Sequence, residues 1–341
     1  MTLFVTGGTG FLGRRVVTEV LRRGHNVVCL VRGADRAGEL ERHVPSPHIR
    51  RLQFVVGELA DARSCRAMLE PCDGVVHVAA RLTGSASLLF ASTVVATRTL
   101  VDAAVEKGVQ RFVLVSSLGV YDTHRLPPNG TLDESTTLDP LPHLRDAYTY
   151  SKIEQERLAW DACNGLGLPL VVIRPAVVFG PGRTVLTNRI GLRIGPLMVR
   201  MGGARRAPCT YVDNCAAAVA LAVDVPGIDG QAFNVVDDHL PTVDEVFRAY
   251  TSGVVPVPAV TVPQWAVPLV AGMCEWYSGR SRGQFPMVVT RYRSSAQWKP
   301  LRYSNERAKR VLGWRPFVPF PEALDRTIAA LRRDTCANGP R

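Results

Sequence analysis

A glycine-rich turn near the start of the chain constrains the fold more than any other feature. Residues Thr6–Gly13 read Thr-Gly-Gly-Thr-Gly-Phe-Leu-Gly and separate the apolar run Leu3–Val5 from a segment whose apolar residues recur at helical spacing. Between a strand and a helix, Gly7 permits a tight turn, and Gly10 lets backbone amides approach a pyrophosphate at the helix N-terminus. Gly13 lets the helix pack closely on the strand. The pattern predicts a dinucleotide-binding turn, with an ordinary glycine loop as the alternative.

Strand-like and helix-like segments alternate after this turn. Two long stretches, 88–107 and about 148–163, have helical patterns. Six further apolar runs read as buried strands: 26–31, 52–56, 74–80, 111–116, 170–174 and 231–236. Such alternation predicts an α/β fold, a Rossmann-type doubly wound parallel sheet covered by helices on both faces.

The alternation becomes irregular from Gly180 onward, where glycine and proline turns accumulate. We therefore expect a dinucleotide-binding Rossmann domain over residues 1–180, with late strands contributed by about 209–240. Residues 181–335 are expected to form most of the substrate-binding region. We expect this smaller C-terminal cap to be interleaved with the sheet rather than to form a separable domain.

Composition and charge narrow the functional classes. Hydrophobic residues make up 46% of the 341 residues and charged residues 21%, as in ordinary soluble globular proteins. We see neither a signal-peptide pattern nor an uninterrupted apolar run long enough to span a bilayer, so we expect a cytoplasmic protein. The eight cysteines and seven histidines are dispersed, which predicts reduced thiols and no metal site. The net charge of +11 includes arginines spread in ones and twos, and we expect no nucleic-acid partner.

Two positions after predicted strands bear on the choice of cofactor. Arg32 follows the second strand, where an acid would hold ribose hydroxyls and repel a ribose phosphate; an arginine can instead pair with that phosphate. This predicts NADP(H), with NAD(H) as the alternative cofactor and a merely exposed arginine as the simplest interpretation. After the third strand, Glu58 and Leu59 place an acid where an adenine amino group would lie.

A tyrosine and a lysine lie one helical turn apart in the second long helical stretch. Tyr148 and Lys152 share one face, so the ammonium can approach the phenol and a cofactor ribose and lower the pKa of the phenol. Such a phenol can exchange a proton with a carbonyl or an alcohol. Ser117, at the end of the fifth predicted strand, can hydrogen-bond the same substrate oxygen. Capping of a helix or turn is the alternative role of Ser116 and Ser117.

Together these motifs resemble the extended, atypical short-chain dehydrogenase/reductase family, within the NAD-dependent epimerase/dehydratase superfamily, over nearly the whole chain. The resemblance is carried by the glycine turn and by segments at 57–61, 77–80, 115–121, 148–152, 173–182, 211–214, 233–235 and 307–314. It implies a catalytic set of Ser117, Tyr148 and Lys152, a nicotinamide cofactor and a homodimer built on two sheet-covering helices. The implied cofactor-binding residues are Gly7, Thr9, Gly10, Phe11, Leu12, Gly13, Arg32, Glu58, Leu59, Ala79, Ala80, Tyr148, Lys152, Pro175 and Val177.

Two departures from the family pattern bear on its branches. Thr93 stands where the family commonly has an asparagine, so the water-holding role of that asparagine is open. Members that epimerise or dehydrate nucleotide sugars usually carry an acid at Val31 or Arg32, and a longer basic segment than residues 204–208. The chain therefore looks more like the hydroxysteroid dehydrogenase and dihydroflavonol reductase branch.

The sequence thus predicts an NADP(H)-dependent oxidoreductase that interconverts a ketone and a secondary alcohol on a hydrophobic small molecule. An NAD-dependent nucleotide-sugar epimerase or dehydratase is the alternative enzyme, and a non-catalytic dinucleotide sensor is the alternative from another class. The proline-broken apolar stretch 254–274 is expected to wall an apolar substrate pocket and to offer contact with a membrane or a lipophilic carrier. Core packing is its alternative role.

Overall fold

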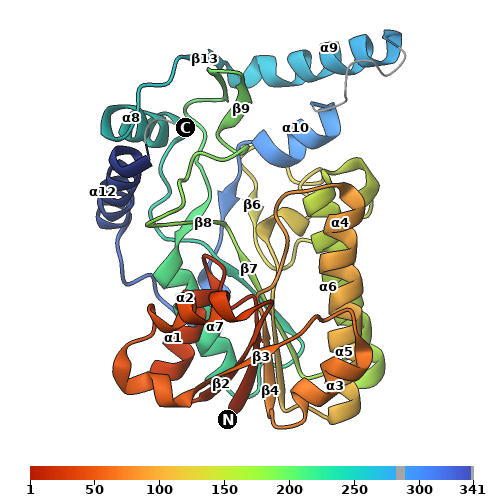
Figure 1. The fold of residues 1–341 in the computed structure, drawn as a ribbon. Coiled ribbons are helices and arrows are strands. Elements are labelled where there is room, and N and C mark those ends of the chain that lie inside the picture. The colour runs from red at the N-terminus through yellow and green to blue at the C-terminus, as the bar shows by residue number, and fades with distance from the viewer. Residues whose placement is uncertain (282–288, 339–341) are drawn as a thin grey trace.

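A parallel sheet forms the centre of the protein. The computed structural model describes residues 1–281 and 289–338, and within them seven parallel strands pair in the order β12-β7-β5-β4-β1-β2-β3 (Figure 1). They are β1 (Thr2–Thr6), β2 (Asn26–Val31), β3 (Leu52–Val56), β4 (Gly74–His77), β5 (Arg111–Val115), β7 (Leu170–Pro175) and β12 (Gln231–Val235). Every predicted strand is present. The fourth ends at His77 rather than at residue 80, and residues 78–80 line a cavity instead.

Helices cover both faces of this sheet, which confirms the predicted doubly wound architecture (Figure 1). They are α1 (Gly13–Arg22) and α7 (Val212–Asp224) on one face, and α3 (Ala62–Leu69), α5 (Ala96–Lys107) and α6 (Ala147–Leu166) on the other. Successive strand residues point to opposite faces: Leu3 and Val5 pack in the first core and Phe4 in the second, all fully buried. Each such side chain stabilises the fold by roughly 1.5–3 kcal/mol.

The helix expected over 88–107 is divided in the structure. α4 (Ala86–Phe90) passes through one π-helical turn, Ala91–Val95, into α5. The combined stretch Ala86–Lys107 is long and apolar enough to cross a membrane by length and composition, although polar residues such as Arg98 and Asp102 interrupt it. Half of its most apolar window is buried. Leu100 and its neighbours pack in the second core, which accounts for the apolar character of the stretch.

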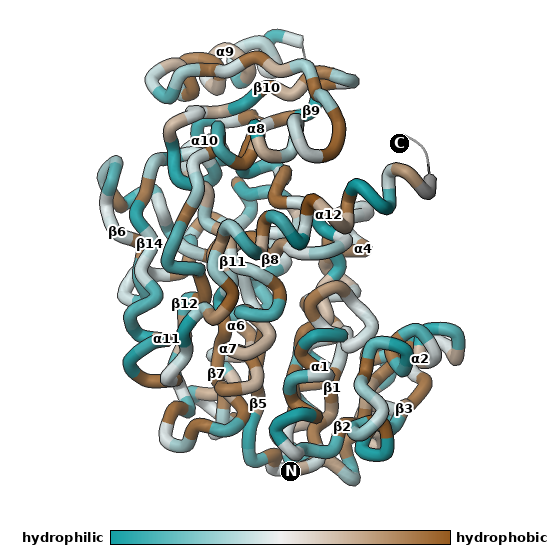
Figure 2. The backbone as a smooth tube through the Cα atoms, turned by 90° about the vertical axis from the view of Figure 1, so that its left-hand side faces the viewer, coloured by the Kyte–Doolittle hydropathy of each residue, from teal (hydrophilic) through white to brown (hydrophobic). Residues whose placement is uncertain are grey.

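Smaller elements form a cap around one end of the sheet (Figures 1 and 2). Its strands are β9 (Gly191–Ile194), β10 (Leu197–Met201) and β13 (Ala259–Val262), which form a separate sheet. Its helices are α8 (Val243–Gly253), α9 (Val267–Arg280), α10 (Arg291–Trp298) and α12 (Phe320–Asn338). Other elements are β6 (Thr131–Leu132) paired with β14 (Arg302–Tyr303), β8 (Val177–Phe179) paired with β11 (Cys209–Tyr211), α2 (Ala34–Glu41) and α11 (Glu306–Val311).

The late part of the chain returns to the central sheet. β12 is an edge strand of that sheet, α7 packs on one of its faces, and Ala308 of α11 joins the same core. Residues far beyond 180 therefore contribute to the sheet layer. The domain division at residue 180 stays a prediction.

Candidate active site

A cavity of about 1310 Å³ lies at the carboxyl ends of the sheet strands, which is where open α/β sheets bind ligands. Its lining includes residues directly after β1, β2, β4 and β5, together with the start of α6. The structure brings every candidate residue to this one cavity: Gly7, Thr9, Gly10, Phe11, Leu12, Gly13, Arg32, Glu58, Leu59, Ala79, Ala80, Ser117, Tyr148, Lys152, Pro175 and Val177. Their individual roles stay predictions.

The glycine turn forms a bare backbone surface on one side of the cavity. Gly7 has a φ of 72°, and a β-carbon there would lie 2.7 Å from the backbone nitrogen of Ala79. A β-carbon on Gly13 would overlap the carbonyl oxygen of Gly7. Neither position tolerates a side chain, and no side chain among the described residues caps the N-terminus of α1. A helix N-terminus beside glycines that carry no side chain fits the pyrophosphate of a nicotinamide dinucleotide.

The adenine end of the cavity carries Arg32 and Glu58, both exposed. Within residues 1–281 and 289–338, no side chain pairs with Arg32, whereas its neighbour Arg36 forms an ion pair with Glu39 at 3.0 Å. Asp61 lies three residues after Glu58, but its carboxylate is already used within the protein. It caps α3 by accepting from Arg63 N at 3.1 Å.

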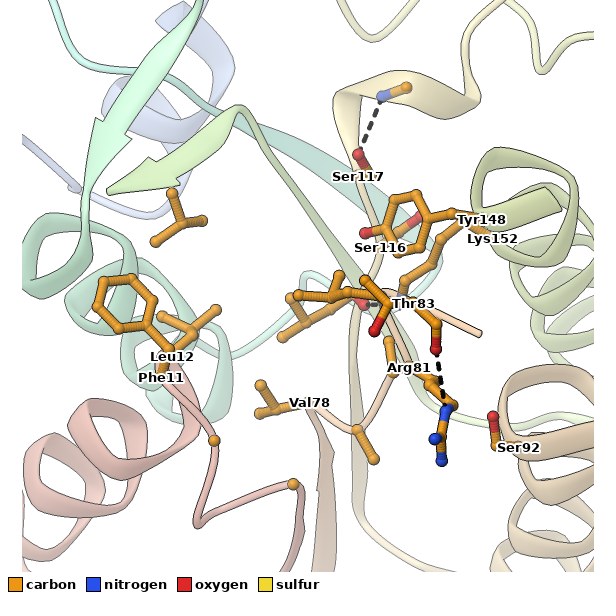
Figure 3. Close-up of a pocket in the computed structure, with 18 of the residues that line it drawn as sticks. Phe11, Leu12, Val78, Arg81, Thr83, Ser92, Ser116, Ser117, Tyr148 and Lys152 are labelled. Atoms are coloured by element: carbon orange, nitrogen blue, oxygen red, sulfur yellow. Dashed lines mark hydrogen bonds between the residues drawn. The ribbon is translucent and has the colours of Figure 1, made fainter. Parts of the chain in front are cut away.

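The start of α6 sets the position of the tyrosine. Asp146 caps this helix: its carboxylate accepts from Thr149 N at 3.0 Å and from Thr149 Oγ1 at 2.7 Å. Tyr148 and Lys152 follow on the face that lines the cavity, and Figure 3 shows both side chains beside Ser117. The Ser117 hydroxyl also accepts from Gly119 N at 3.1 Å, so the turn-capping alternative holds as well. A capping serine of this kind still has its own proton to donate.

Burial controls the ionisation of both groups. Lys152 is 2% exposed, and burial lowers its pKa to about 7, with Glu156 opposing the shift. Burial raises the pKa of the Tyr148 phenol, opposed by Arg183 and, more weakly, by Ser117 and Arg189. This corrects our expectation that Lys152 lowers the pKa of Tyr148, because in the protein alone Lys152 has other partners.

Those partners form a buried polar chain beneath the cavity. Lys152 Nζ donates to the Val115 carbonyl at 2.8 Å and to Gln155 Oε1 at 2.7 Å. Gln155 Nε2 donates to Thr97 Oγ1 at 2.7 Å, and Thr97 lies 2.7 Å from His77 Nε2. No sequence pattern points to Gln155, since a glutamine three residues after a lysine is common on a helix.

A second buried network fixes α6 to the sheet. Glu156 is fully buried and accepts from Arg174 Nε at 2.9 Å and from Ser116 Oγ at 2.5 Å. Arg174 Nη1 donates to the Tyr121 hydroxyl at 2.7 Å, which donates to Asn234 Oδ1 at 2.6 Å. A buried network of this kind is costly to break, so it holds the helix that carries Tyr148 in one register against the ends of β5 and β7.

Thr93, which stands where the family commonly has asparagine, lies in the π-helical turn. Its side chain is 2% exposed, and its hydroxyl has no hydrogen-bond partner among the described residues. Its carbonyl accepts from Thr97 Oγ1 at 2.5 Å. Thr93 thus contacts the Gln155 chain through its backbone carbonyl.

The substrate end of the cavity differs from expectation. No described residue of the stretch 254–274 lines it, and Trp265 and Leu269 are instead 74% and 60% exposed. The prediction that this stretch walls the pocket is therefore wrong. α9 extends outward from the cap (Figure 1), and other residues close this end of the cavity: Arg145, Arg183, Asn188, Arg189, Leu192, Arg293, Gln297 and Trp298.

This lining is more cationic than an apolar pocket. Arg183 follows the glycine–proline turn that the sequence motif contains, so its place near the cofactor side could have been found. Arg189 has no such signal, because no periodicity distinguishes a loop arginine that faces a cavity from one that faces solvent.

Comparison with known sequences is consistent with the geometry. The sequence profile of the NAD dependent epimerase/dehydratase family matches residues 3–235, which contain the glycine turn, Ser117, Tyr148 and Lys152.

Two curated relatives match over most of their length. Sterol-4-alpha-carboxylate 3-dehydrogenase, decarboxylating, of Mus musculus is 28% identical over 354 residues, covering 97% of this chain and 91% of its own. The 2-alkyl-3-oxoalkanoate reductase of Stenotrophomonas maltophilia (strain K279a) is 29% identical over 346 residues, covering 97% of this chain and 99% of its own.

Among solved structures, dTDP-glucose 4,6-dehydratase of Streptomyces venezuelae with NAD bound superposes with a TM-score of 0.74. It is 23% identical and covers 100% of this chain and 99% of its own, a likeness that shows the fold.

Proposed function

Because this chain belongs to the NAD-dependent epimerase/dehydratase family, in the extended short-chain dehydrogenase/reductase branch, it is an NAD(P)-dependent oxidoreductase, and we propose that it interconverts a ketone and a secondary alcohol on a hydrophobic small molecule with NADP(H). The main support for this proposal is that Ser117, Tyr148 and Lys152 line the same cavity as the glycine turn (Figure 3).

Each of the three residues has a distinct task in this proposal. The nicotinamide dinucleotide, held by the glycine turn, supplies or accepts a hydride when bound. Tyr148 keeps its proton at neutral pH, because burial raises its pKa, and donates that proton to the substrate oxygen during reduction. Ser117 donates a hydrogen bond to the same oxygen. Lys152 holds the cofactor ribose with its ammonium.

The names of the two relatives support a hydrophobic ketone or alcohol as substrate. One acts at carbon 3 of a sterol that bears a carboxylate on carbon 4; the other reduces an oxo group at carbon 3 of an alkanoate that bears an alkyl group on carbon 2. In both names the oxygen-bearing carbon neighbours the carbon that carries the carboxylate. The nucleotide-sugar alternative has support from the fold alone.

Replacing the tyrosine tests the proposal. We expect Tyr148→Phe to lower kcat at least about a hundredfold, since the general acid is lost, with NADPH affinity nearly unchanged. Tyr150→Phe, on the same helix but outside the cavity lining, is the control and should retain full activity. The measurement is NADPH absorbance over a panel of steroidal, aromatic and long-chain ketones.

Net consumption of NADPH by the wild-type protein separates this proposal from an epimerase or dehydratase, which returns the hydride to its own intermediate. A Tyr148→Phe protein with most of its activity intact would contradict the assignment. A wild-type protein that binds cofactor and turns over nothing would support the sensor alternative.

The exposed apolar residues near α9 suggest a second contact for the protein. Trp265, Leu269, Met273 and Trp276 are each more than half exposed and recur every three or four residues, so they form one stripe, which we call the α9 stripe. Arg280 closes the helix, and the chain has a net charge of +11. We propose that the α9 stripe rests on an anionic lipid surface. The homodimer and the cytoplasmic location stay predictions.

A further inference from the structure

Arg189 is an arginine at the substrate end of the cavity, next to the candidate catalytic groups. Arg189 lines the cavity, and none of the described residues forms an ion pair or hydrogen bond with its guanidinium. Burial lowers the pKa of Arg189, with Tyr303 opposing the shift. A partly buried guanidinium without a counter-charge is costly, so the place of Arg189 in the cavity lining points to an anion that arrives with a ligand.

The nearby acids do not neutralise Arg189. Asp146 uses both carboxylate oxygens to cap α6 through Thr149. Asp139 is fully buried and pairs with Arg145 at 2.6 Å. Each carboxylate already has a partner that the fold requires, and neither forms an ion pair with Arg189 among the described residues.

Arg189 lies beside the candidate catalytic groups. A β-carbon built on Gly119 would lie 3.4 Å from Ser117 Oγ and 3.7 Å from Arg189 Nη2, so both groups flank the same glycine. Arg189 is also close enough to Tyr148 to oppose the rise in the pKa of its phenol. A substrate oxygen held by Ser117 and Tyr148 therefore brings the neighbouring atoms of the substrate within reach of Arg189.

We propose that Arg189 binds a carboxylate that the substrate carries on the carbon adjacent to the reacting carbon. This inference rests on the proposed function and narrows its substrate class to 3-hydroxy or 3-oxo carboxylic acids with a hydrophobic body. It agrees with the arrangement that the names of both relatives describe. Arginine suits this task because its planar fork can bind a carboxylate through two parallel hydrogen bonds.

Two of the other arginines at this end of the cavity already have protein partners. Arg145 is paired with Asp139, and Arg293 donates to the carbonyls of Leu144 and Arg145. The Arg183 guanidinium lies over the Phe11 ring of the glycine turn, 5.6 Å from its centroid. Arg183 also acts on the Tyr148 phenol, so competition by a nucleotide sugar is one of the outcomes that the test below must exclude.

The test compares 2-butyl-3-hydroxyoctanoate with its uncharged methyl ester, each oxidised with NADP⁺. We expect wild-type kcat/KM to favour the acid by roughly tenfold to a hundredfold, the range of a charge-assisted hydrogen bond. Arg189→Gln should abolish this preference by slowing the acid alone, and Arg189→Lys should restore part of it. Arg193→Gln removes an exposed arginine on β9, outside the cavity lining, and should leave both rates unchanged.

Three results would overturn the inference: equal use of acid and ester by the wild type, an equal loss for both in Arg189→Gln, or competition by dTDP-glucose at micromolar concentration. The first two leave the proposed function standing, because an alcohol is still oxidised. If no alcohol reacts, the proposed function fails, and calorimetric binding of the same acid to the NADP⁺-loaded protein decides the inference. Binding that is lost in Arg189→Gln supports it, and absence of binding to the wild type overturns it.

Discussion

Arg32 tests the cofactor choice at the scale of a single residue. Its guanidinium has no partner among the described residues and lines the adenine end of the cavity. The ribose phosphate of NADPH would supply the missing partner of this guanidinium, so we expect NADPH to bind roughly tenfold to a hundredfold more tightly than NADH. Arg32→Ala should remove that difference. Isothermal titration with both cofactors measures it.

Arg36→Ala is the matched control, because Arg36 lines the same cavity but is already paired with Glu39 at 3.0 Å. We expect its effect on the NADPH preference to be smaller than that of Arg32→Ala. Equal affinities for the two cofactors in the wild type would show that Arg32 merely faces solvent.

At the scale of an element, the α9 stripe predicts lipid binding. Leu269 is 60% exposed on α9, and we expect Leu269→Asp to weaken binding to vesicles of phosphatidylcholine and phosphatidylserine roughly tenfold, because an apolar side chain no longer enters the interface. Since the stretch does not line the cavity, the KM for a soluble substrate should stay unchanged. Vesicle co-sedimentation is the measurement.

Leu166→Asp is the matched control: Leu166 is 62% exposed at the end of α6 and lies outside the stripe. Its vesicle binding should equal that of the wild type. Identical binding by all three proteins, or no binding by any, would show that the α9 stripe does not meet lipid.

For the whole molecule, two buried groups give stability an unusual dependence on pH. Burial lowers the pKa of His77 to about 3, so between that pH and its ordinary value the unfolded chain binds a proton that the folded protein does not. Burial raises the pKa of Asp237 to about 6, so between its ordinary value and pH 6 the folded protein holds a proton that the unfolded chain releases. Acidification therefore destabilises through His77 and stabilises through Asp237.

We expect Asp237→Asn to remove the second contribution. Its free energy of unfolding should fall more steeply than that of the wild type between pH 6.5 and pH 4, by about 3 kcal/mol over the window. Urea titrations at several pH values measure this. Asp35→Asn, which changes an exposed acid on α2, should follow the wild type. Parallel profiles for Asp237→Asn and the wild type would contradict the assignment.

Local sequence patterns determined the sheet, the glycine turn and the candidate catalytic set. Apolar periodicity depends on near neighbours, so the strands could be read in order, and the positions after them could be assigned to one edge. Gly7 and Gly13 were predicted to lie where the backbone leaves no space for a side chain. The structure agrees, since neither position has room for a β-carbon. Tyr148 and Lys152 were found from their spacing of one helical turn, and Ser117 from its place at the end of a predicted strand.

The tertiary structure alone decided which residues cover the carboxyl ends of the sheet strands and where the long side chains point. An apolar stretch reads the same whether it faces a cavity or solvent, so the sequence could not show that Trp265 and Leu269 are exposed. Lys152 donates to Gln155 of its own helix and to the Val115 carbonyl, and the carbonyl lies within reach only after α6 packs on β5. Arg189 became a candidate ligand only when the fold enclosed its charge without a partner, a property of packing that residue order does not encode.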